Sequence, residues 1–267
     1  MLRVAVSGAT GRMGSRIIAL MNEYEGLSLA AAIDRNDHPG IGKDVGSLIS
    51  LGELGVRLSS SVEDLAGKAD VLIEFSSVAA TLEHLRIASK KGISMVIGTT
   101  GFSGDEMAEI KNLTRDIPCV FAPNMSVGVN LLLKVLRDVA VVLGEDYDIE
   151  IVEAHHRLKK DAPSGTALKM ASVIAEAVGR NLEDVAVYAR HGIIGERSKR
   201  EIGIQAIRAG DIVGEHTVIF GGLGERIEIT HKASSRDTFA RGALRAAQWL
   251  SGKGPGLYDM QDVLGLK

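Results

Sequence analysis

The chain of 267 residues is long enough for one or two domains with sizeable cores. Hydrophobic residues make up 45% and charged residues 24%, as in ordinary globular proteins. The net charge of -3 means that no excess of positive charge attracts anionic surfaces, so we expect neither nucleic acid nor a membrane surface as a partner. One cysteine excludes an internal disulfide and favours a reducing compartment. Because no signal peptide or bilayer-spanning apolar run is visible, we expect a cytoplasmic location.

The first 34 residues have the pattern of a dinucleotide-binding unit. Leu2–Ser7 predicts a strand, Gly8–Gly14 is a glycine-rich turn, and Ser15–Asn22 has helical periodicity. The spacing G-x-x-G-x-x-G is a variant of the dinucleotide fingerprint, in which glycines permit a tight turn, close approach of a pyrophosphate and close helix packing. A second predicted strand, Leu27–Ile33, ends at Asp34, where a ribose-binding carboxylate belongs. The alternative is an ordinary βα turn with a surface Asp.

Asp34 and its neighbour Arg35 bear on the choice of nucleotide. A carboxylate at this position binds the ribose hydroxyls of NAD and repels the extra phosphate of NADP, whereas an adjacent Arg can hold that phosphate. Having both residues points to the use of both NADH and NADPH. The alternative for Arg35 is a solvated charge with no ligand.

Strands and helices continue to alternate as far as residue 122. We expect strands at Ala69–Ser76, Ser94–Gly98 and Cys119–Ala122, and helices at Val78–Lys91 and Ser103–Asp116. This order predicts a doubly wound parallel sheet with right-handed crossovers, whose ligands bind outside the carboxyl ends of the strands. The small residues Gly98, Thr99 and Thr100 suit close approach of a ring, although a plain βα turn is the alternative. The glycine-rich segment 36–61 is expected to be a loop with little regular structure, and we assign it no role.

The pattern changes after a predicted helix at Ser126–Leu143, which places Val127, Leu131, Val135 and Val139 on one face. Strands with period-two alternation and few intervening helices follow, and they predict an α+β domain with an open mixed sheet. The expected strands are Asp148–Glu153, Val185–Ala189, Glu201–Arg208, Glu215–Phe220 and Glu225–Lys232, and the expected helix among them is Ala167–Val178.

The end of the chain is expected to return to the first domain through a helix at Ser235–Leu250, followed by a short amphipathic tail. We therefore expect a dinucleotide-binding domain of residues 1–125, completed by 235–267. A substrate-binding and oligomerisation domain would then comprise residues 126–234.

Titratable side chains are concentrated in one short stretch of the second domain. His155, His156, Lys159 and Lys160 lie within six residues, on a predicted strand-to-helix connection. Imidazole exchanges a proton near neutral pH and lysine adds a compact positive charge, so the cluster suits an anionic substrate that needs a proton. The step 164–166, Ser-Gly-Thr, opens a helix whose first amides can receive a carboxylate.

Two other interpretations of this stretch are a solvated basic loop with a Ser cap and a metal site. Polar residues crowd both sides of the helix start, and the nucleotide fingerprint lies in the same chain, which weighs against a mere solvated loop. Adjacent residues on a strand point to opposite faces, so His155 and His156 would not ligate one ion together. The sole cysteine, Cys119, is also far away in sequence. We therefore expect no metal.

Six segments distributed over the whole length resemble the dihydrodipicolinate reductase family, now named 4-hydroxy-tetrahydrodipicolinate reductase. The block that runs from Glu153 to Ala167, with its His-His, Lys and Pro-Ser-Gly-Thr elements, is highly specific to that family. The other matching segments are Gly8–Gly14, Val96–Phe102, Asn124–Asn130, Arg208–His216 and Ile229–Arg236.

The resemblance implies reduction of 4-hydroxy-tetrahydrodipicolinate, a cyclic dicarboxylate, to tetrahydrodipicolinate with NADH or NADPH, in diaminopimelate and lysine biosynthesis. It also implies a homotetramer held together by the sheet domain. His155 would be the general acid and Lys159 its partner in proton donation and substrate binding. The substrate's carboxylates would meet His156, Gly165 and Thr166. The cofactor would contact Gly8, Ala9, Thr10, Gly11, Arg12, Met13, Asp34, Arg35, Gly98, Thr99, Thr100, Ala122, Pro123, Asn124 and Met125.

Two alternatives to this function remain at the level of the sequence. One is a non-catalytic nucleotide-sensing protein, which would not need the intact His155 and Lys159 pair. The other is a different two-domain NAD(P)-dependent reductase of a small acid, against which the Pro-Ser-Gly-Thr block argues. The family often has Glu where this chain has Asp34, and either acid can bind ribose.

Overall fold

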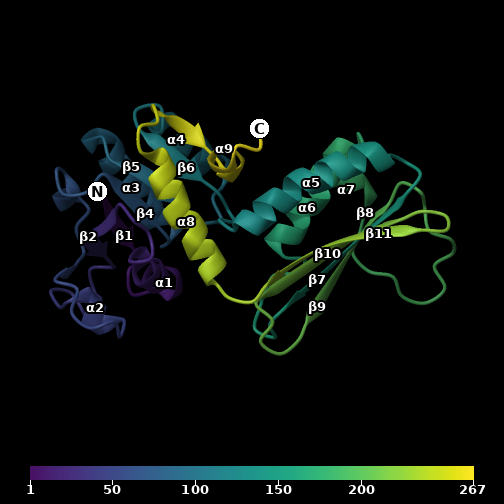
Figure 1. Ribbon diagram of the computed structural model, residues 1–267. Helices are drawn as coiled ribbons and strands as arrows, with labels where there is room; N and C mark the ends of the chain where they lie inside the picture. Colours follow the sequence, from purple (N-terminus) through teal and green to yellow (C-terminus); the bar gives the residue numbers. More distant parts are fainter. The chain divides into compact units, whose positions relative to one another are not determined.

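A computed structural model describes all residues from 1 to 267 and divides the chain into two compact units (Figure 1). The first unit contains Met1–Val127 and Arg236–Lys267, and the second contains Gly128–Ser235. The chain thus leaves the first unit once and comes back to complete it. None of the helices is long and apolar enough to cross a membrane.

The first unit is built on a seven-stranded parallel sheet in the order β12-β6-β5-β4-β1-β2-β3. The chain runs outward from β1 to one edge, then crosses back beside β1 and continues to the other edge, so the strand order reverses between β1 and β4. This arrangement confirms the predicted Rossmann-like, doubly wound sheet. Its strands are β1 (Leu2–Ser7), β2 (Leu27–Ile33), β3 (Leu58–Ser59), β4 (Val71–Glu74), β5 (Ser94–Ile97), β6 (Pro118–Phe121) and β12 (Gly256–Tyr258).

Alternating side chains of the central strands enter two separate cores, one on each face of the sheet. Val4 and Val6 pack in one core with helices α1 and α8, while Ala5 between them packs in the other with α3 and α4. The period of two along a strand therefore explains why consecutive residues in the middle of these strands are apolar. The covering helices are α1 (Arg12–Met21), α3 (Val78–Lys91), α4 (Gly104–Leu113) and α8 (Asp237–Leu250).

Two segments of the first unit contain more regular structure than their composition predicts. Segment 36–61, expected to be a loop, includes the short helix α2 (Val45–Leu48) and the edge strand β3. Asp44 caps α2 by accepting from the amide of Ser47, and its carboxylate also accepts from Leu54. The tail contributes β12, which pairs with β6, and helix α9 (Met260–Leu264). These elements span two to five residues, too short for a periodic signal.

The second unit contains a five-stranded mixed sheet in the order β11-β10-β7-β9-β8. Strand β10 runs antiparallel to both β7 and β11, whereas β7, β9 and β8 are parallel. This confirms the open mixed sheet. Helices α5 and α6 cover one face, as Figure 1 shows, and share a core with it. The elements are α5 (Val127–Leu143), β7 (Asp148–His155), α6 (Gly165–Ala177), α7 (Leu182–Val185), β8 (Ala186–Val187), β9 (Ile202–Arg208), β10 (Gly214–Gly221) and β11 (Arg226–Ala233).

The face of α5 that is buried is not the one that carries the predicted row Val127, Leu131, Val135 and Val139. Leu131 and Val135 from that row are 48% and 37% exposed. The residues that enter the core are instead Val129, Leu132, Leu136 and Ala140. Apolar residues with helical spacing occupy both faces of this helix, so periodicity alone could not decide which face is covered.

Two predicted boundaries in the second unit were wrong. Strand β7 extends to His155, so this residue ends a strand instead of lying in the following connection. The strand expected at Val185–Ala189 is reduced to two residues, because Asn181 caps the one-turn helix α7 by accepting from the amide of Glu183. A capping side chain and acidic residues in the first turn favour a helix start over the apolar alternation.

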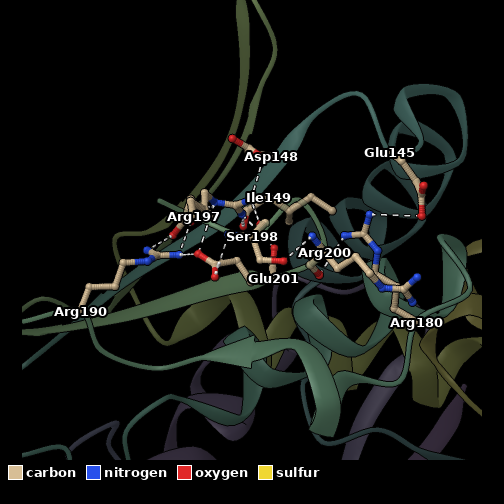
Figure 2. Close-up of polar contacts among 10 residues, drawn as sticks. Glu145, Asp148, Ile149, Arg180, Arg190, Arg197, Ser198, Arg200 and Glu201 are labelled. Atoms are coloured by element: carbon tan, nitrogen blue, oxygen red, sulfur yellow. Dashed lines mark hydrogen bonds and ion pairs between the residues drawn. The ribbon is translucent and has the colours of Figure 1, made fainter. Parts of the chain in front are cut away.

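The face of this sheet opposite α5 and α6 carries a network of ion pairs (Figure 2). Glu150 of β7 accepts from Arg190 at 2.7 Å and from Arg197 at 3.0 Å. Arg190 also binds Glu201 at 2.7 Å, and Arg197 binds Asp148 at 2.7 Å. The two carboxylates raise the pKa of Arg190. The network fastens segment 188–201 to β7 and β9.

The turn between β1 and α1 depends on contacts that only glycine permits. Gly8 adopts a φ of +68°, a left-handed conformation that is unfavourable for other residues. A Cβ atom on Gly14 would lie 2.1 Å from the carbonyl oxygen of Gly8 and 2.7 Å from the Cα atom of Ala9. The third glycine of the fingerprint therefore allows helix and turn to touch, as the sequence predicts.

We expect Gly14→Ala to lower the free energy of unfolding by about 1–3 kcal/mol, because backbone atoms must move to admit the methyl group. Chemical denaturation at neutral pH measures this change. Gly104→Ala is the matched control, since nothing lies within 4 Å of its Cβ position, and it should change stability by less than about 1 kcal/mol. Equal stability of the Gly14 variant and wild type would contradict the proposed close contact.

Candidate functional site

A hollow of about 270 Å³ lies at the carboxyl ends of β1, β4 and β5, close to where the strand order reverses. It brings the glycine-rich turn beside the small residues predicted to follow β5. A larger hollow of about 430 Å³ lies at the amino ends of the strands, where parallel sheets do not usually bind ligands. The first hollow is lined by Arg12, Met13, Phe75, Ser76, Ser77, Val78, Gly98, Thr99 and Thr100.

The backbone around this hollow fits the pyrophosphate of a dinucleotide. Helix α1 begins after Gly11, which has no side chain to cap it, so the amides of its first turn are not covered by a cap. Gly98 packs so closely on Phe75 that a Cβ atom would lie 2.2 Å from the ring. The uncapped start of α1 thus leaves backbone amides for a ligand, while Gly98 is the residue that the close contact with Phe75 permits.

Asp34 lies at the end of β2 and is tied to the glycine-rich turn. Its Oδ2 accepts from the amide of Thr10 at 3.0 Å and from the Thr10 hydroxyl at 2.7 Å, while Oδ1 accepts from the amide of Arg35 at 2.9 Å. Burial raises the pKa of Asp34, but the Thr10 and Arg35 hydrogen bonds outweigh it and lower the pKa below its usual value. An ionised carboxylate is suited to accept from ribose hydroxyls.

Arg35 points into solvent beside the same strand end. Its side chain is 70% exposed, and Nε pairs with Asp37 at 3.1 Å. An exposed ion pair of this kind contributes little stability, so an incoming phosphate could replace Asp37 at small cost. His38 follows, and its Nε2 lies 3.2 Å from the Thr10 hydroxyl, a contact that the sequence did not suggest.

The predicted cofactor segment after β6 divides into core and surface. Ala122 and Met125 are buried in the core, whereas Pro123 is exposed and Asn124 is half-buried. A Cβ atom on Gly242 would lie 1.7 Å from the carbonyl oxygen of Met125, so α8 packs directly against this backbone. Met125 therefore shapes the segment from within the core.

The residues predicted to do chemistry surround the end of β7 in the second unit. His155 and Glu153 are two positions apart on this strand, on the face that α5 and α6 cover. The Nδ1 atom of His155 lies 2.6 Å from Oε2 of Glu153. An ionised carboxylate can only accept, so Nδ1 carries a proton and Nε2 is the nitrogen left for chemistry.

The Glu153 carboxylate is fully buried and has three further donors. Arg208 of β9 binds both oxygens at 2.8 Å, and the amide of Ser164 donates to Oε1 at 2.9 Å. Burial raises the pKa of Glu153, but Arg208, His155 and Ser164 lower it more, so the group stays ionised. These contacts join β7, β9 and the start of α6 at one point.

Ser164 connects this carboxylate to a second histidine. Its hydroxyl caps α6 by accepting from the amide of Ala167 at 3.2 Å, and it lies 3.1 Å from Nε2 of His216. The His216 ring stands edge-on to that of His155, with centroids 5.1 Å apart. Burial, together with the charge of nearby groups such as His155, lowers the pKa of His216 to about 4, so its ring is neutral at physiological pH.

The connection after β7 presents the remaining predicted residues. Lys159 donates to both carboxylate oxygens of Asp161 at 2.9 Å. Nδ1 of His156 is buried without a hydrogen-bond partner in the chain. Gly165 and Thr166 form the first turn of α6, where helix amides point away from the helix.

Burial lowers the pKa of His155, and the nearby positive charges of Lys159 and Arg208 act in the same direction. The hydrogen bond and negative charge of Glu153 oppose this effect. Glu153 thus stabilises the charged form of the imidazole, whereas burial, Lys159 and Arg208 favour its neutral form. Such a balance is typical of a group that exchanges a proton.

Sequence reasoning overlooked the residues that hold His155. Glu153, Arg208 and His216 lie within segments that resemble the family, but none received a role. One local signal was available for Glu153: residues i and i+2 of a strand share a face, so a strand that continued to His155 would place Glu153 beside it. Nothing local could pair Arg208 with Glu153, because these residues are 55 positions apart.

The buried His216 should make stability depend on pH. Its folded pKa is about 4 against an ordinary 6.5, so unfolding takes up a proton between these values. Its contribution to stability is present above pH 6.5 and lost as pH falls toward 4, by about 2 kcal/mol between pH 7 and pH 5.

We therefore expect His216→Gln to flatten the decline in unfolding free energy between pH 7 and pH 5, as measured by urea denaturation. The matched control is His191→Gln, because solvent already surrounds the exposed His191 ring in the folded chain. It should retain the wild-type slope. An unchanged slope in the His216 variant would show that the histidine is not held neutral.

Comparison with known proteins identifies relatives over the full length. Family profiles described as "Dihydrodipicolinate reductase, N-terminus" and "Dihydrodipicolinate reductase, C-terminus" match residues 2–125 and 128–264. The 4-hydroxy-tetrahydrodipicolinate reductases of Syntrophus aciditrophicus and Geobacter sulfurreducens are 56% and 55% identical over 267 residues, covering 100% of this chain and of each relative.

Solved structures agree with these sequence relatives. A dipicolinate-bound dihydrodipicolinate reductase from Paenisporosarcina sp. TG-14 has a TM-score of 0.77 at 26% identity and covers 98% of both chains. A probable dehydrogenase from Thermotoga maritima, with a TM-score of 0.61 at 14% identity over 98% of this chain and 92% of that chain, is similar in fold alone. The chain belongs to the dihydrodipicolinate reductase family, whose members are oxidoreductases that use NADH or NADPH.

Proposed function

We propose that this chain reduces 4-hydroxy-tetrahydrodipicolinate to tetrahydrodipicolinate with NADH or NADPH, in the biosynthesis of diaminopimelate and lysine. Full-length relatives of this name support the substrate. The observation that carries the chemistry is the buried His155, whose Nδ1 is held by Glu153 so that Nε2 can serve a substrate. A nucleotide-sensing protein without turnover would have no use for this arrangement.

We assign the nucleotide to the hollow at the carboxyl ends of β1, β4 and β5. The bound nucleotide would supply a hydride from its nicotinamide ring. The turn from Gly8 to Met13 would hold the pyrophosphate, with Asp34 at the ribose and Arg35 at a 2′-phosphate. The backbone at 98–100 and 122–125 would flank the nicotinamide half. The fit of the glycine turn and the ionised state of Asp34 support this assignment.

The substrate's two carboxylates require positive groups and hydrogen-bond donors. We assign them to His156 and to the first turn of α6 at Gly165 and Thr166, where helix amides and the positive end of the helix dipole favour an anion. Lys159 would balance the remaining charge after exchanging Asp161 for the substrate. A relative from Paenisporosarcina sp. TG-14 binds dipicolinate, which is a planar dicarboxylate of this class.

We assign the proton to Nε2 of His155. Hydride addition to a conjugated ring leaves negative charge that a proton must quench, and His155 would donate that proton with Lys159 as its partner. The Glu153 carboxylate would stabilise the charged imidazolium before transfer. Lys160 is exposed and receives no role.

We also propose a cytoplasmic homotetramer that assembles through the second unit. The fully exposed Ile193 and the half-exposed Ile194 and Ile207 are apolar side chains that association would cover. The one thiol, Cys119, is buried in the first unit, and its burial raises its pKa, so it is an unreactive core residue suited to a reducing compartment.

Replacement of His155 by Ala should lower kcat by roughly 10²–10⁴-fold, the usual contribution of a general acid. The Kd values for NADH and for dipicolinate should stay within a few-fold of wild type, because the ring does not hold either one by itself. Steady-state kinetics and calorimetric titration measure these quantities. Wild-type turnover by the folded variant would exclude His155 as the acid.

Arg35→Ala should reduce kcat/KM for NADPH about tenfold. This is the lower end of what a charge-assisted hydrogen bond contributes, because solvent screens this exposed group. The kcat/KM for NADH should change little. Arg115→Ala is the matched control, because it removes an exposed charge that precedes β6, at the amino ends of the strands. If Arg35→Ala reduces both cofactors equally, Arg35 is a solvated charge that does not bind the phosphate.

A further inference from the structure

We propose that Glu153 is a positioning residue for the reaction: its carboxylate orients the His155 ring and keeps Nε2 as the nitrogen that delivers the proton. This inference rests on the proposed function for its kinetic consequences. Glu153 itself touches neither substrate nor cofactor in this assignment, and it acts through the imidazole.

The first support is the geometry of the pair. Both side chains project from the same face of β7, and the contact of 2.6 Å is short, as expected for a hydrogen bond to an ionised group. On the other side of the ring, Nε2 faces Gly214, whose absent side chain leaves it room: a Cβ atom there would lie 3.0 Å from Nε2. The ring is thus held at one nitrogen and left uncrowded at the other.

The second support is the rigidity of the carboxylate. Glu153 has no exposed surface, and its oxygens receive two hydrogen bonds from Arg208 and one from the Ser164 amide, in addition to His155. Arg208 is itself fixed by donating to the carbonyl oxygen of Asp161 at 2.6 Å. A group held from three elements loses no further freedom when it orients a neighbour, which is the requirement for preorganisation.

The third support is the balance of charge around the ring. Lys159 from the connection and Arg208 from β9 disfavour the imidazolium, and the neutral His216 from β10 adds no counter-charge. The carboxylate of Glu153 favours the charged ring through its hydrogen bond and its negative charge. Without it, burial and two positive charges would act on the imidazole unopposed.

A purely structural role is the competing explanation, because the Glu153–Arg208 pair also joins β7 to β9. Removing one partner of a buried pair leaves an uncompensated charge and destabilises a protein strongly. Loss of activity alone would therefore not distinguish positioning from folding. The pH profile of kcat and the protonation of the ring nitrogens do distinguish them.

The test begins with Glu153→Gln, which keeps the size of the side chain and removes its charge. We expect kcat at pH 7.5 to fall about 10- to 100-fold, part of the contribution of a general acid, with KM changed less than threefold. An acid must be protonated to act, so kcat declines as pH rises through its pKa. That decline should move to lower pH by at least about one unit in the variant.

Two further variants control for stability. Glu150→Gln removes another arginine-bound carboxylate of the same strand, which lies on the opposite face and binds Arg190 and Arg197. It should leave the pH profile of kcat unchanged. The double variant Glu153→Gln with Arg208→Met removes the stranded charge along with its partner and should be easier to fold. The positioning role requires that its kcat remain low and its profile remain displaced, by less than in Glu153→Gln because the charge of Arg208 no longer disfavours the imidazolium.

Nitrogen NMR of the His155 ring completes the test without relying on turnover. In wild type the neutral ring should carry its proton on Nδ1, and in Glu153→Gln a substantial fraction should move to Nε2. A folded Glu153 variant with the wild-type pH profile and the wild-type tautomer would overturn the proposal. If wild type fails to reduce the substrate but the tautomer shifts as expected, the proposed function fails while the positioning of the ring stands.

Discussion

A buried carboxylate that has to be neutralised organises the second unit. Removing such a group from water costs several kcal/mol unless it is paired and hydrogen-bonded. Glu153 satisfies this requirement with Arg208, with the amide of Ser164 and with His155. Each partner is anchored on β7, β9 or the start of α6, so neutralising one charge aligns three elements. The His155 imidazole is consequently held at a point where three elements are fastened together.

The first unit relies on close backbone contact in place of buried charge. Gly14 lets α1 touch the turn after β1, and Gly98 lets the end of β5 touch the ring of Phe75. These contacts leave amides and small residues around the hollow at the carboxyl ends of the strands. The two units therefore offer two different chemical environments: exposed helix-start amides in the first unit, and a fixed, charged cluster in the second. The proposed function uses the first for a pyrophosphate and the second for a dicarboxylate and a proton.

Expectations from the sequence failed where several local signals competed or where the element was short. Helix α5 is apolar on more than one face, and only the packing of the sheet selected the row with Leu132 and Leu136. The segment after Asn181 combines a cap with apolar alternation, and the cap prevailed at its start. Strand β3 has two residues, so it exists because β2 offers an edge to pair with, not because of its own periodicity.

The sequence by itself determined the features whose causes are local. The glycine spacing dictated the turn before α1, alternation dictated the main strands, and the block with His155 and Lys159 identified the family and its chemistry. Only the tertiary structure decided the partners: Thr10 meets Asp34 across 24 positions, and Glu153 meets Arg208 across 55. Such contacts depend on strand register and on the burial that several elements create together. No short stretch of sequence encodes them, because the cost of an unpaired buried charge arises only after the core has formed.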